Sequence, residues 1–203
     1  MIFTPLRLFL SLALLGAAAN ASTIFNFDSD TPGTSTTFTD SVDGLSATFS
    51  SSADPGGFVV YASMFETLTG NVLGDPGPAG LDNLALKIGF SQNLSAITLD
   101  FATSDFITPS PFTITTFEGS TQVGTATSTG QFLQGFTFPE GEITFEGGPF
   151  DNVVLSSTAM DFAVDNVTVI AAPEPGTLAL LGAGLLLTGL PSLRRRKAAA
   201  SNT

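Results

Sequence analysis

The sequence predicts an all-β fold, an antiparallel β-sandwich of the jelly-roll type, for residues 22–172. In this range apolar and polar residues alternate with a period of two in several short segments, which places one face of each strand in the core and the other in water. Turn-forming Gly, Pro and Asp residues recur between these segments. No amphipathic helix pattern is found in the same range, so strands alone are expected to form the core.

The expected strands follow one another along the chain with turn signals between them. The alternating segments are 45–50, 84–91, 97–101, 112–114, 143–145, 153–155 and 162–169. Turns are expected at 54–57, 75–78, 118–120 and 147–149, and a long surface loop at 70–83. About nine to eleven short strands suffice for two packed sheets. Their period predicts six core residues, which are Leu99, Phe101, Ile114, Phe145, Leu155 and Val164.

The last expected strand contains a break in its alternation. Apolar residues lie at Phe162 and Val164 and then at Val167, so the pattern slips by one residue. Such a slip indicates a β-bulge, which turns the side chains it carries to a new direction. Asp165 and Asn166 occupy this bulge although both are poor strand formers. A specific role is therefore expected for these two side chains.

The composition excludes several classes of function. The chain has no Cys and no His, which excludes disulfide cross-links, Ser-His-Asp and Cys-His catalysis, and His-based metal sites. Residues 22–172 hold 17 acidic residues and a single base, Lys87, so their net charge is near −16. Such a surface repels phosphate backbones, and no nucleic-acid partner is expected. Divalent cations and neutral polysaccharides are compatible with it.

The N-terminal residues have the three parts of a secretory signal peptide. Arg7 supplies the positive region, residues 8–15 the apolar region, and Ala19 and Ala21 the small-residue cleavage pattern. Residues 1–21 are therefore expected to be removed on export, and the mature chain is expected to begin at Ser22.

The C-terminal residues combine a short motif, an apolar segment and a basic cluster. The motif is Pro173, Glu174 and Pro175, and apolar residues follow at 177–190. As a helix, residues 177–193 would be about 25 Å long, at the short end of what spans a bilayer. The basic cluster is expected to stay in the cytoplasm and to stop transfer. Its members are Arg194, Arg195, Arg196 and Lys197.

This order of motif, apolar segment and basic cluster resembles the PEP-CTERM sorting tail of bacterial exported proteins. The resemblance implies that residues 173–197 are a sorting signal with a transmembrane helix, and that an exosortase-like processing enzyme recognises the Pro-Glu-Pro motif. It also implies transient anchoring in the inner membrane and then a location at the cell surface or outside the cell. Residues 198–203 are expected to be a disordered tail. The resemblance concerns sorting, and it names no ligand of the domain.

The last expected strand also resembles the final strand of carbohydrate-binding jelly-roll modules and of many PEP-CTERM ectodomains. In the former, an acid at this place often helps to hold a structural calcium against the first strand. The resemblance therefore implies a Ca²⁺ site formed by Asp28, Asp30, Asp165 and Asn166, completed by carbonyl oxygens. The alternative is an Asx turn at 28–30 and a buried hydrogen-bonded pair at 165–166.

Three nearby acids suggest a different chemistry. Glu140, Glu142 and Glu146 lie close together in the sequence, and a carboxylate pair is what a glycosidase needs. Their parity is opposite to that of the apolar residues of the same strand, which predicts a solvated face instead. The chain also has no Trp and one Tyr, Tyr61, although sugar-binding clefts usually carry aromatic platforms.

Three hypotheses of different classes follow. The favoured one is a non-enzymatic structural protein of the cell surface or extracellular matrix, sorted and cleaved by an exosortase-like enzyme. The alternative is a calcium-dependent carbohydrate-binding module that acts on exopolysaccharide. A carboxylate-based glycosidase is the least favoured. A glycan array with and without calcium distinguishes the first two.

Overall fold

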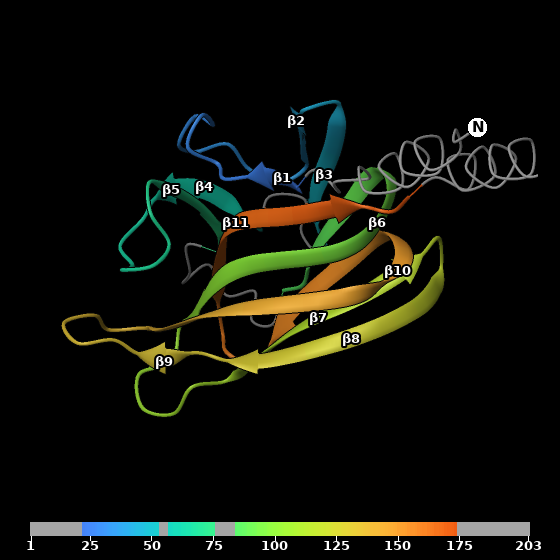
Figure 1. Cartoon of the computed structure of the whole chain (residues 1–203). Coiled ribbons are helices and arrows are strands. Elements are labelled where there is room, and N and C mark those ends of the chain that lie inside the picture. The colour runs from blue at the N-terminus through green and yellow to red at the C-terminus, as the bar shows by residue number, and fades with distance from the viewer. Residues whose placement is uncertain (1–21, 53–56, 76–83, 174–203) are drawn as a thin grey trace, which may run out of the picture. The chain divides into compact units, whose positions relative to one another are not determined.

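The computed structural model describes residues 22–52, 57–75 and 84–173. This part of the chain forms eleven strands and no helix, and every strand pair is antiparallel (Figure 1). The predicted all-β antiparallel class is therefore confirmed. The strands are β1 (Ser22–Phe25), β2 (Phe38–Val42), β3 (Leu45–Ser51), β4 (Val59–Ala62), β5 (Asn71–Gly74), β6 (Leu86–Thr103), β7 (Pro111–Glu118), β8 (Thr121–Thr129), β9 (Gln131–Phe132), β10 (Pro139–Ser157) and β11 (Phe162–Ala171). Within these described ranges, no helix is long and apolar enough to cross a membrane.

The strands form two layers that enclose the core, and two long strands, β6 and β10, belong to both layers. Residues 86–90 of β6 pair with β3, whereas residues 94–103 pair with β11. β10 pairs with both parts of β6, and its register shifts between Glu146 and Phe150 and again between Phe150 and Asn152. Hydrogen bonds therefore join all eleven strands in one sheet. The two separate sheets expected from the sequence are instead two layers of one folded sheet.

Aromatic rings fill the space between the layers. Phe101 on β6 stacks on Phe112 of β7 with ring centroids 4.5 Å apart. Phe112 also meets Phe162 of β11 at 5.2 Å, and Phe25 of β1 meets Phe49 of β3 at 6.3 Å. None of these strand pairs is hydrogen-bonded, so the contacts cross the interior and define the core.

The alternation predicts most of this core correctly. Five of the six predicted residues, Leu99, Phe101, Ile114, Leu155 and Val164, are fully buried. Phe145 is half-buried and packs at the edge of the core. Its ring lies over Gly124 of β8, where a Cβ atom would come within 2.5 Å of it. The ring of Phe145 therefore packs on β8 at the edge of the core.

The prediction of a long surface loop at 70–83 is wrong in part. Residues 71–74 form β5, which pairs with β4 on one side and β11 on the other. Val72 and Leu73 of this strand are fully buried. The Gly- and Pro-rich composition of the stretch conceals these two apolar residues, whose burial accounts for the strand.

The last strand has the bulge that the sequence predicts. The register of β11 against β6 shifts between Asp165 and Thr168, and Asn166 adopts a φ of 50°. β1 pairs with residues 167–170 of β11, so the two ends of the domain lie side by side (Figure 1). The bulge therefore places Asp165 near the turn that follows β1, where Asp28 lies.

Most residues of the predicted export and sorting signals lie outside the described residues. These are Ala19, Ala21, Glu174, Pro175, Arg194, Arg195, Arg196 and Lys197. Ser22, the expected first residue of the mature chain, begins β1, and Pro173 is exposed just after β11. The signal peptide, the membrane span and the disordered tail stay predictions.

Candidate functional site

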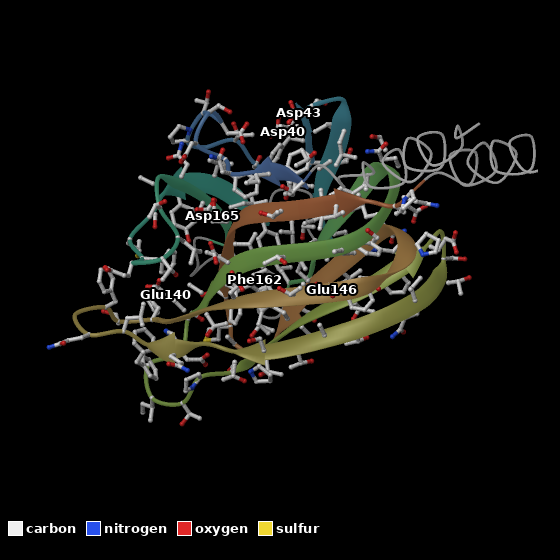
Figure 2. The ribbon with its side chains drawn as sticks, in the orientation of Figure 1. Asp40, Asp43, Glu140, Glu146, Phe162 and Asp165 are labelled. Atoms are coloured by element: carbon white, nitrogen blue, oxygen red, sulfur yellow. The ribbon has the colours of Figure 1, made fainter. Side chains whose placement is uncertain are left out.

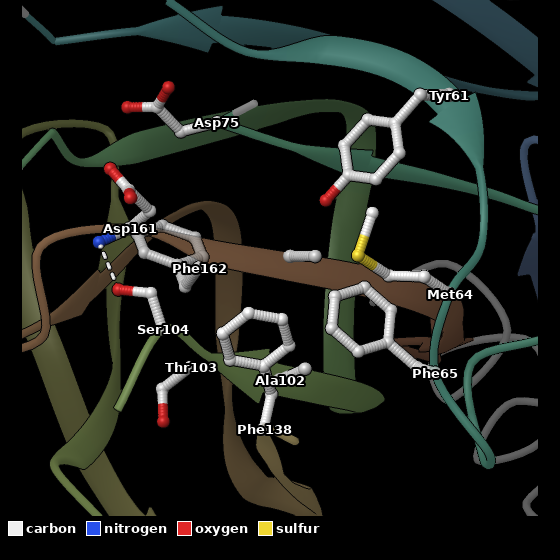
Figure 3. Close-up of a pocket in the computed structure, with 11 residues that line it drawn as sticks. Tyr61, Met64, Phe65, Asp75, Ala102, Thr103, Ser104, Phe138, Asp161 and Phe162 are labelled. Carbon is white, nitrogen blue, oxygen red and sulfur yellow. Dashed lines mark hydrogen bonds between the residues drawn. The ribbon is translucent and has the colours of Figure 1, made fainter. Parts of the chain in front are cut away.

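A pocket of about 350 Å³ lies where the β4–β5 hairpin meets the end of β6 and the start of β11 (Figure 3). Its apolar side consists of aromatic rings and small side chains. Phe65 and Phe138 meet edge to face with ring centroids 6.0 Å apart, and Phe162 closes the pocket beside them. Beyond the pocket, Phe138 contacts Phe106, which is 70% exposed. The aromatic surface therefore continues from the pocket to the exterior.

The other side of the pocket is polar. The carboxylates of Asp75 and Asp161 and the hydroxyl of Ser104 lie on this side, and the Tyr61 hydroxyl points toward the space between them and the rings (Figure 3). The backbone N–H of Asp161 donates to Ser104 Oγ at 2.9 Å, and the N–H of Asp75 donates to the carbonyl oxygen of Phe162 at 3.1 Å. These bonds fix the backbone beneath both acids.

Burial and nearby negative charge both affect the ionisation of Tyr61. Burial, and to a smaller extent the nearby carboxylates of Asp75 and Asp161, together raise the pKa of its phenol from 10.0 to about 12. The group therefore stays a neutral hydroxyl, able to donate and to accept hydrogen bonds. Gly74 makes room for it, because a Cβ atom there would lie 2.8 Å from the Tyr61 hydroxyl oxygen and from the Ala163 methyl.

Residues 63–70 join β4 to β5 and carry Met64 and Phe65 to the pocket. Glu140 of β10, which is 3% exposed, holds this segment. Its carboxylate accepts hydrogen bonds from the backbone N–H groups of Glu66 and Thr67 and from the Thr67 hydroxyl, at 2.7–3.1 Å. One wall of the pocket is thus tied to a carboxylate from a distant strand.

Glu140 corrects the expectation of a solvated row of acids. Glu142 and Glu146 are exposed as the strand period predicts, but the 63–70 segment covers Glu140. Glu140 and Glu146 lie apart along β10 (Figure 2). The three acids considered for a glycosidase are therefore not brought together.

Asp165 is fully buried in the bulge of β11. The pKa of its carboxyl is raised from 3.8 to about 6, chiefly by burial and also by Asp28 and Asp100, while hydrogen bonds from backbone N–H groups oppose the shift. These donors are Asn166 at 2.7 Å and Thr69 at 3.2 Å. The side-chain amide of Asn166 donates to the carboxylate of Asp100 on β6 at 2.9 Å. The bulge thus contains hydrogen-bonded side chains, and Thr69 links it to the 63–70 segment.

Asp28 and Asp30 lie in a turn just after β1. The backbone N–H of Asn71 donates to Asp28 Oδ1 at 2.9 Å, and a side chain in place of Gly70 would collide with the same carboxylate. Asp30 Oδ2 is a buried oxygen with no hydrogen-bond partner, and burial, then Asp40, raise the pKa of this carboxyl. Within the described ranges, no three acidic, His or Cys side chains form a group that could hold a metal ion. The calcium site stays a prediction.

The sequence gives little indication of the residues that line the pocket. Asp75 belongs to an Asp-Pro-Gly turn signal, and Asp161 precedes a strand. At such places Asp commonly forms hydrogen bonds to the backbone of a turn, so neither residue indicates a pocket. The one usable signal is Tyr61, the only tyrosine of the chain.

Comparisons with known proteins find similar strand arrangements only. No family model matches the chain, and no curated protein matches its sequence. Among solved structures, the K2 cleaved adhesin domain of Lys-gingipain is 14% identical, with a TM-score of 0.48 over 73% of this chain and 99% of that one. A mannan-recognising carbohydrate-binding module is 9% identical, with a TM-score of 0.41 over 75% and 99%. A xylan-binding domain from Paenibacillus barcinonensis is 15% identical, with a TM-score of 0.39 over 77% and 100%. Values this low assign no ligand to the pocket.

Proposed function

We propose that the pocket binds a neutral sugar unit of a polysaccharide without cleaving it. The observation that carries this proposal is the joining of aromatic rings with hydroxyl and carboxylate groups in one pocket of about 350 Å³. A sugar ring has apolar C–H faces that pack on aromatic rings, and hydroxyls at its edge that need hydrogen-bond acceptors and donors. Phe65 and Phe138 supply the first kind of contact. Tyr61, Asp75 and Asp161 supply the second.

The charge of the pocket favours neutral sugars over acidic ones. Two carboxylates line it, and Lys87, the single base of residues 22–172, is not among its lining residues. An anionic sugar such as a uronate would bring a third negative charge next to these carboxylates, which is unfavourable at low solvent exposure. A neutral hexose or pentose unit brings only hydroxyls.

The proposal assigns the acids of the pocket a role in binding and not in catalysis. The absence of His and Cys leaves carboxylates as the available acid–base groups. Glu140 accepts hydrogen bonds from the 63–70 segment and is not among the residues that line the pocket, whereas Asp75 and Asp161 are. In this proposal they accept hydrogen bonds from sugar hydroxyls and hold the ligand in place.

We also propose that the protein is exported and sorted as its C-terminal motif implies, with an exosortase-like enzyme as partner. The exposed Pro173 lies two residues after the end of β11, and β1 begins at Ser22 and pairs with β11. Cleavage at either predicted site would leave this pairing intact, because both sites lie outside the paired residues. The sugar-binding domain would then reach the cell surface or the extracellular matrix, where exopolysaccharide is its expected ligand.

A structural Ca²⁺ is a further part of the proposal. Two features support it: Asp28 lies near enough to Asp165 to raise its pKa, and Asp30 has a buried oxygen without a partner. Carboxylate oxygens are the ligands that Ca²⁺ prefers. The three carboxylates are not gathered into a metal-binding group in the structure, so in this proposal they move together when the ion binds. The ion would then stabilise the turn after β1 against the bulge of β11, and it has no role in the pocket itself.

The experiment that tests the proposed function is a glycan array probed with the full-length chain, followed by calorimetric titration of the glycans that bind. We expect neutral oligosaccharides to bind and uronate-containing ones to fail. Phe138→Ala and Asp161→Asn should each weaken binding by about tenfold, which corresponds to about 1.4 kcal/mol. Val123→Ala, which removes an exposed apolar side chain of β8 outside the pocket, is the matched control. Failure of every neutral glycan, or release of new reducing ends on long incubation, would contradict the proposal.

A further inference from the structure

We propose that Glu140 is the positioning residue of the pocket, because its carboxylate fixes the 63–70 segment and thereby holds Met64 and Phe65 in the pocket wall. The consequence for ligand affinity rests on the proposed function. The effect on the shape of the pocket does not, and it can be measured without any ligand.

The contacts of Glu140 leave little freedom to the segment. Its Oε1 accepts the backbone N–H of Glu66 at 2.9 Å, and its Oε2 accepts the backbone N–H and the hydroxyl of Thr67, both at 2.7 Å. These donors are 73 and 74 residues away in the sequence. Hydrogen bonds to a buried carboxylate are short and strong, so one side chain sets the path of two consecutive backbone groups.

The same carboxylate acts on both partners of an aromatic pair. Phe65 directly precedes Glu66, and Phe138 lies two residues before Glu140. Their rings meet edge to face with centroids 6.0 Å apart and form the apolar side of the pocket. Fixing Glu66 to Glu140 therefore fixes the distance between these two rings.

The rest of the segment depends on the same anchor. Leu68, one residue after Thr67, is fully buried in a small apolar cluster with Val72, Ala102 and Ala163. Tyr61 and Phe65 pack against this cluster. If Glu140 no longer accepts the N–H groups of 66 and 67, these groups must turn to water, because a buried donor without a partner is unfavourable. Leu68 and Phe65 would then move outward and uncover Tyr61.

Tyr61 reports this movement directly. It is the only tyrosine of a chain without tryptophan, so intrinsic fluorescence of the full-length protein comes from the pocket alone. The test is quenching of this fluorescence by acrylamide at pH 7, without ligand. Glu140→Ala should raise the quenching constant by about twofold or more, since local opening exposes groups that the native state protects. Glu140→Gln should give an intermediate value, because its amide keeps one acceptor oxygen and presents an N–H₂ group to the remaining donors.

Two controls separate positioning from general loss of stability. Glu142→Gln changes an exposed acid on the same strand and should leave quenching unchanged. Ile88→Val removes a methyl from the fully buried core of β6, outside the pocket lining, and should lower the melting temperature without changing quenching. Far-UV circular dichroism verifies that each variant is folded. Where Glu140→Ala does not fold, Glu140→Gln decides.

Folded Glu140 variants with the quenching constant of the wild type would overturn the proposal. The outcome is also separable from the proposed function. If no glycan binds even the wild type, the proposed function fails while the fluorescence result stands. If the wild type binds a neutral glycan, Glu140→Ala should weaken that binding and Glu142→Gln should not.

Discussion

The carboxylate of Asp165 accepts a hydrogen bond from the backbone N–H of Thr69 at 3.2 Å, across 96 residues of sequence. This contact joins the bulge of β11 to the segment that forms one wall of the pocket. In the same way, Glu140 accepts a hydrogen bond from the backbone N–H of Thr67, and Asp28 accepts one from that of Asn71. Three carboxylates are thus hydrogen-bonded to the backbone of 66–71. Three acids that look dispersed in the sequence thus act on one short segment.

The first prediction concerns pH. The pKa of Asp165 is about 6 in the folded state against an ordinary value of 3.8, so the folded protein binds this proton more tightly than the unfolded chain does. Stability from this group is therefore complete below about pH 4 and is lost as pH rises through 6. The free energy of unfolding should fall by at most about 3 kcal/mol over this range. Urea denaturation of the full-length chain in chelator measures it.

Asp165→Asn is the control for this pH dependence. The variant cannot titrate at position 165, so the slope between pH 4 and 6.5 should become shallower, while the contribution of Asp30, whose pKa is also raised, remains. Equal slopes in the wild type and the variant would show that Asp165 does not have the raised pKa.

The second prediction concerns calcium. If Ca²⁺ binds between Asp28, Asp30 and Asp165, the melting temperature should rise in millimolar calcium and fall in chelator. Binding to the folded state alone adds about 2.7 kcal/mol at a hundredfold excess over Kd. Asp165→Ala should abolish the difference. Identical melting curves of the wild type in calcium and in chelator would favour the interpretation of Asp165 as a hydrogen-bonded core residue without metal.

The third prediction tests the arrangement of the two layers. Phe112 is fully buried and stacks on Phe101 from the opposite layer, with centroids 4.5 Å apart. Phe112→Ala leaves a cavity between the layers and should lower the free energy of unfolding by about 3–5 kcal/mol. Phe132→Ala, at a 40% exposed position on β9, should change it by less than about 0.5 kcal/mol. Similar losses for both variants in urea denaturation would refute the placement of Phe112.

The fourth prediction concerns sorting. Replacement of Pro173 and Glu174 by Ala should leave the C-terminal residues attached and keep the protein in the inner membrane. In the wild type, the surface-located protein should lack the basic cluster 194–197. Intact-mass analysis measures both, and a wild-type surface protein that still carries this cluster would contradict processing.

The period of the strands made the fold largely predictable. Residues such as Leu99 and Leu155 are buried because alternate side chains of a strand face one side of the sheet. The union of 84–91 and 97–101 in the single strand β6 was not predictable, since the intervening Gln92 and Asn93 interrupt the apolar pattern while the backbone continues in the sheet. Composition likewise concealed β5.

The bulge was predictable, whereas the pocket was not. The slip between Val164 and Val167 is a local property of the sequence, and the structure has a register shift there. The pocket, however, joins residues from five separate stretches of the chain. Glu140 shows the reason most clearly, because strand parity places it in water and a segment 73 residues away covers it. Such coverage is a tertiary effect without a local pattern.

The most direct test of the sugar-binding proposal measures whether a sugar binds and, at the same time, whether it binds in the pocket. Neutral oligosaccharides of glucose, mannose and xylose are titrated into the full-length chain while acrylamide quenching of Tyr61 fluorescence is recorded. Because Tyr61 lines the pocket, a bound sugar should shield it and lower the quenching constant as the ligand saturates. Phe138→Ala should require a higher ligand concentration for the same change. Calorimetric binding of a glycan with no change at Tyr61, or no binding of any neutral oligosaccharide, would contradict the proposal that this pocket is a sugar site.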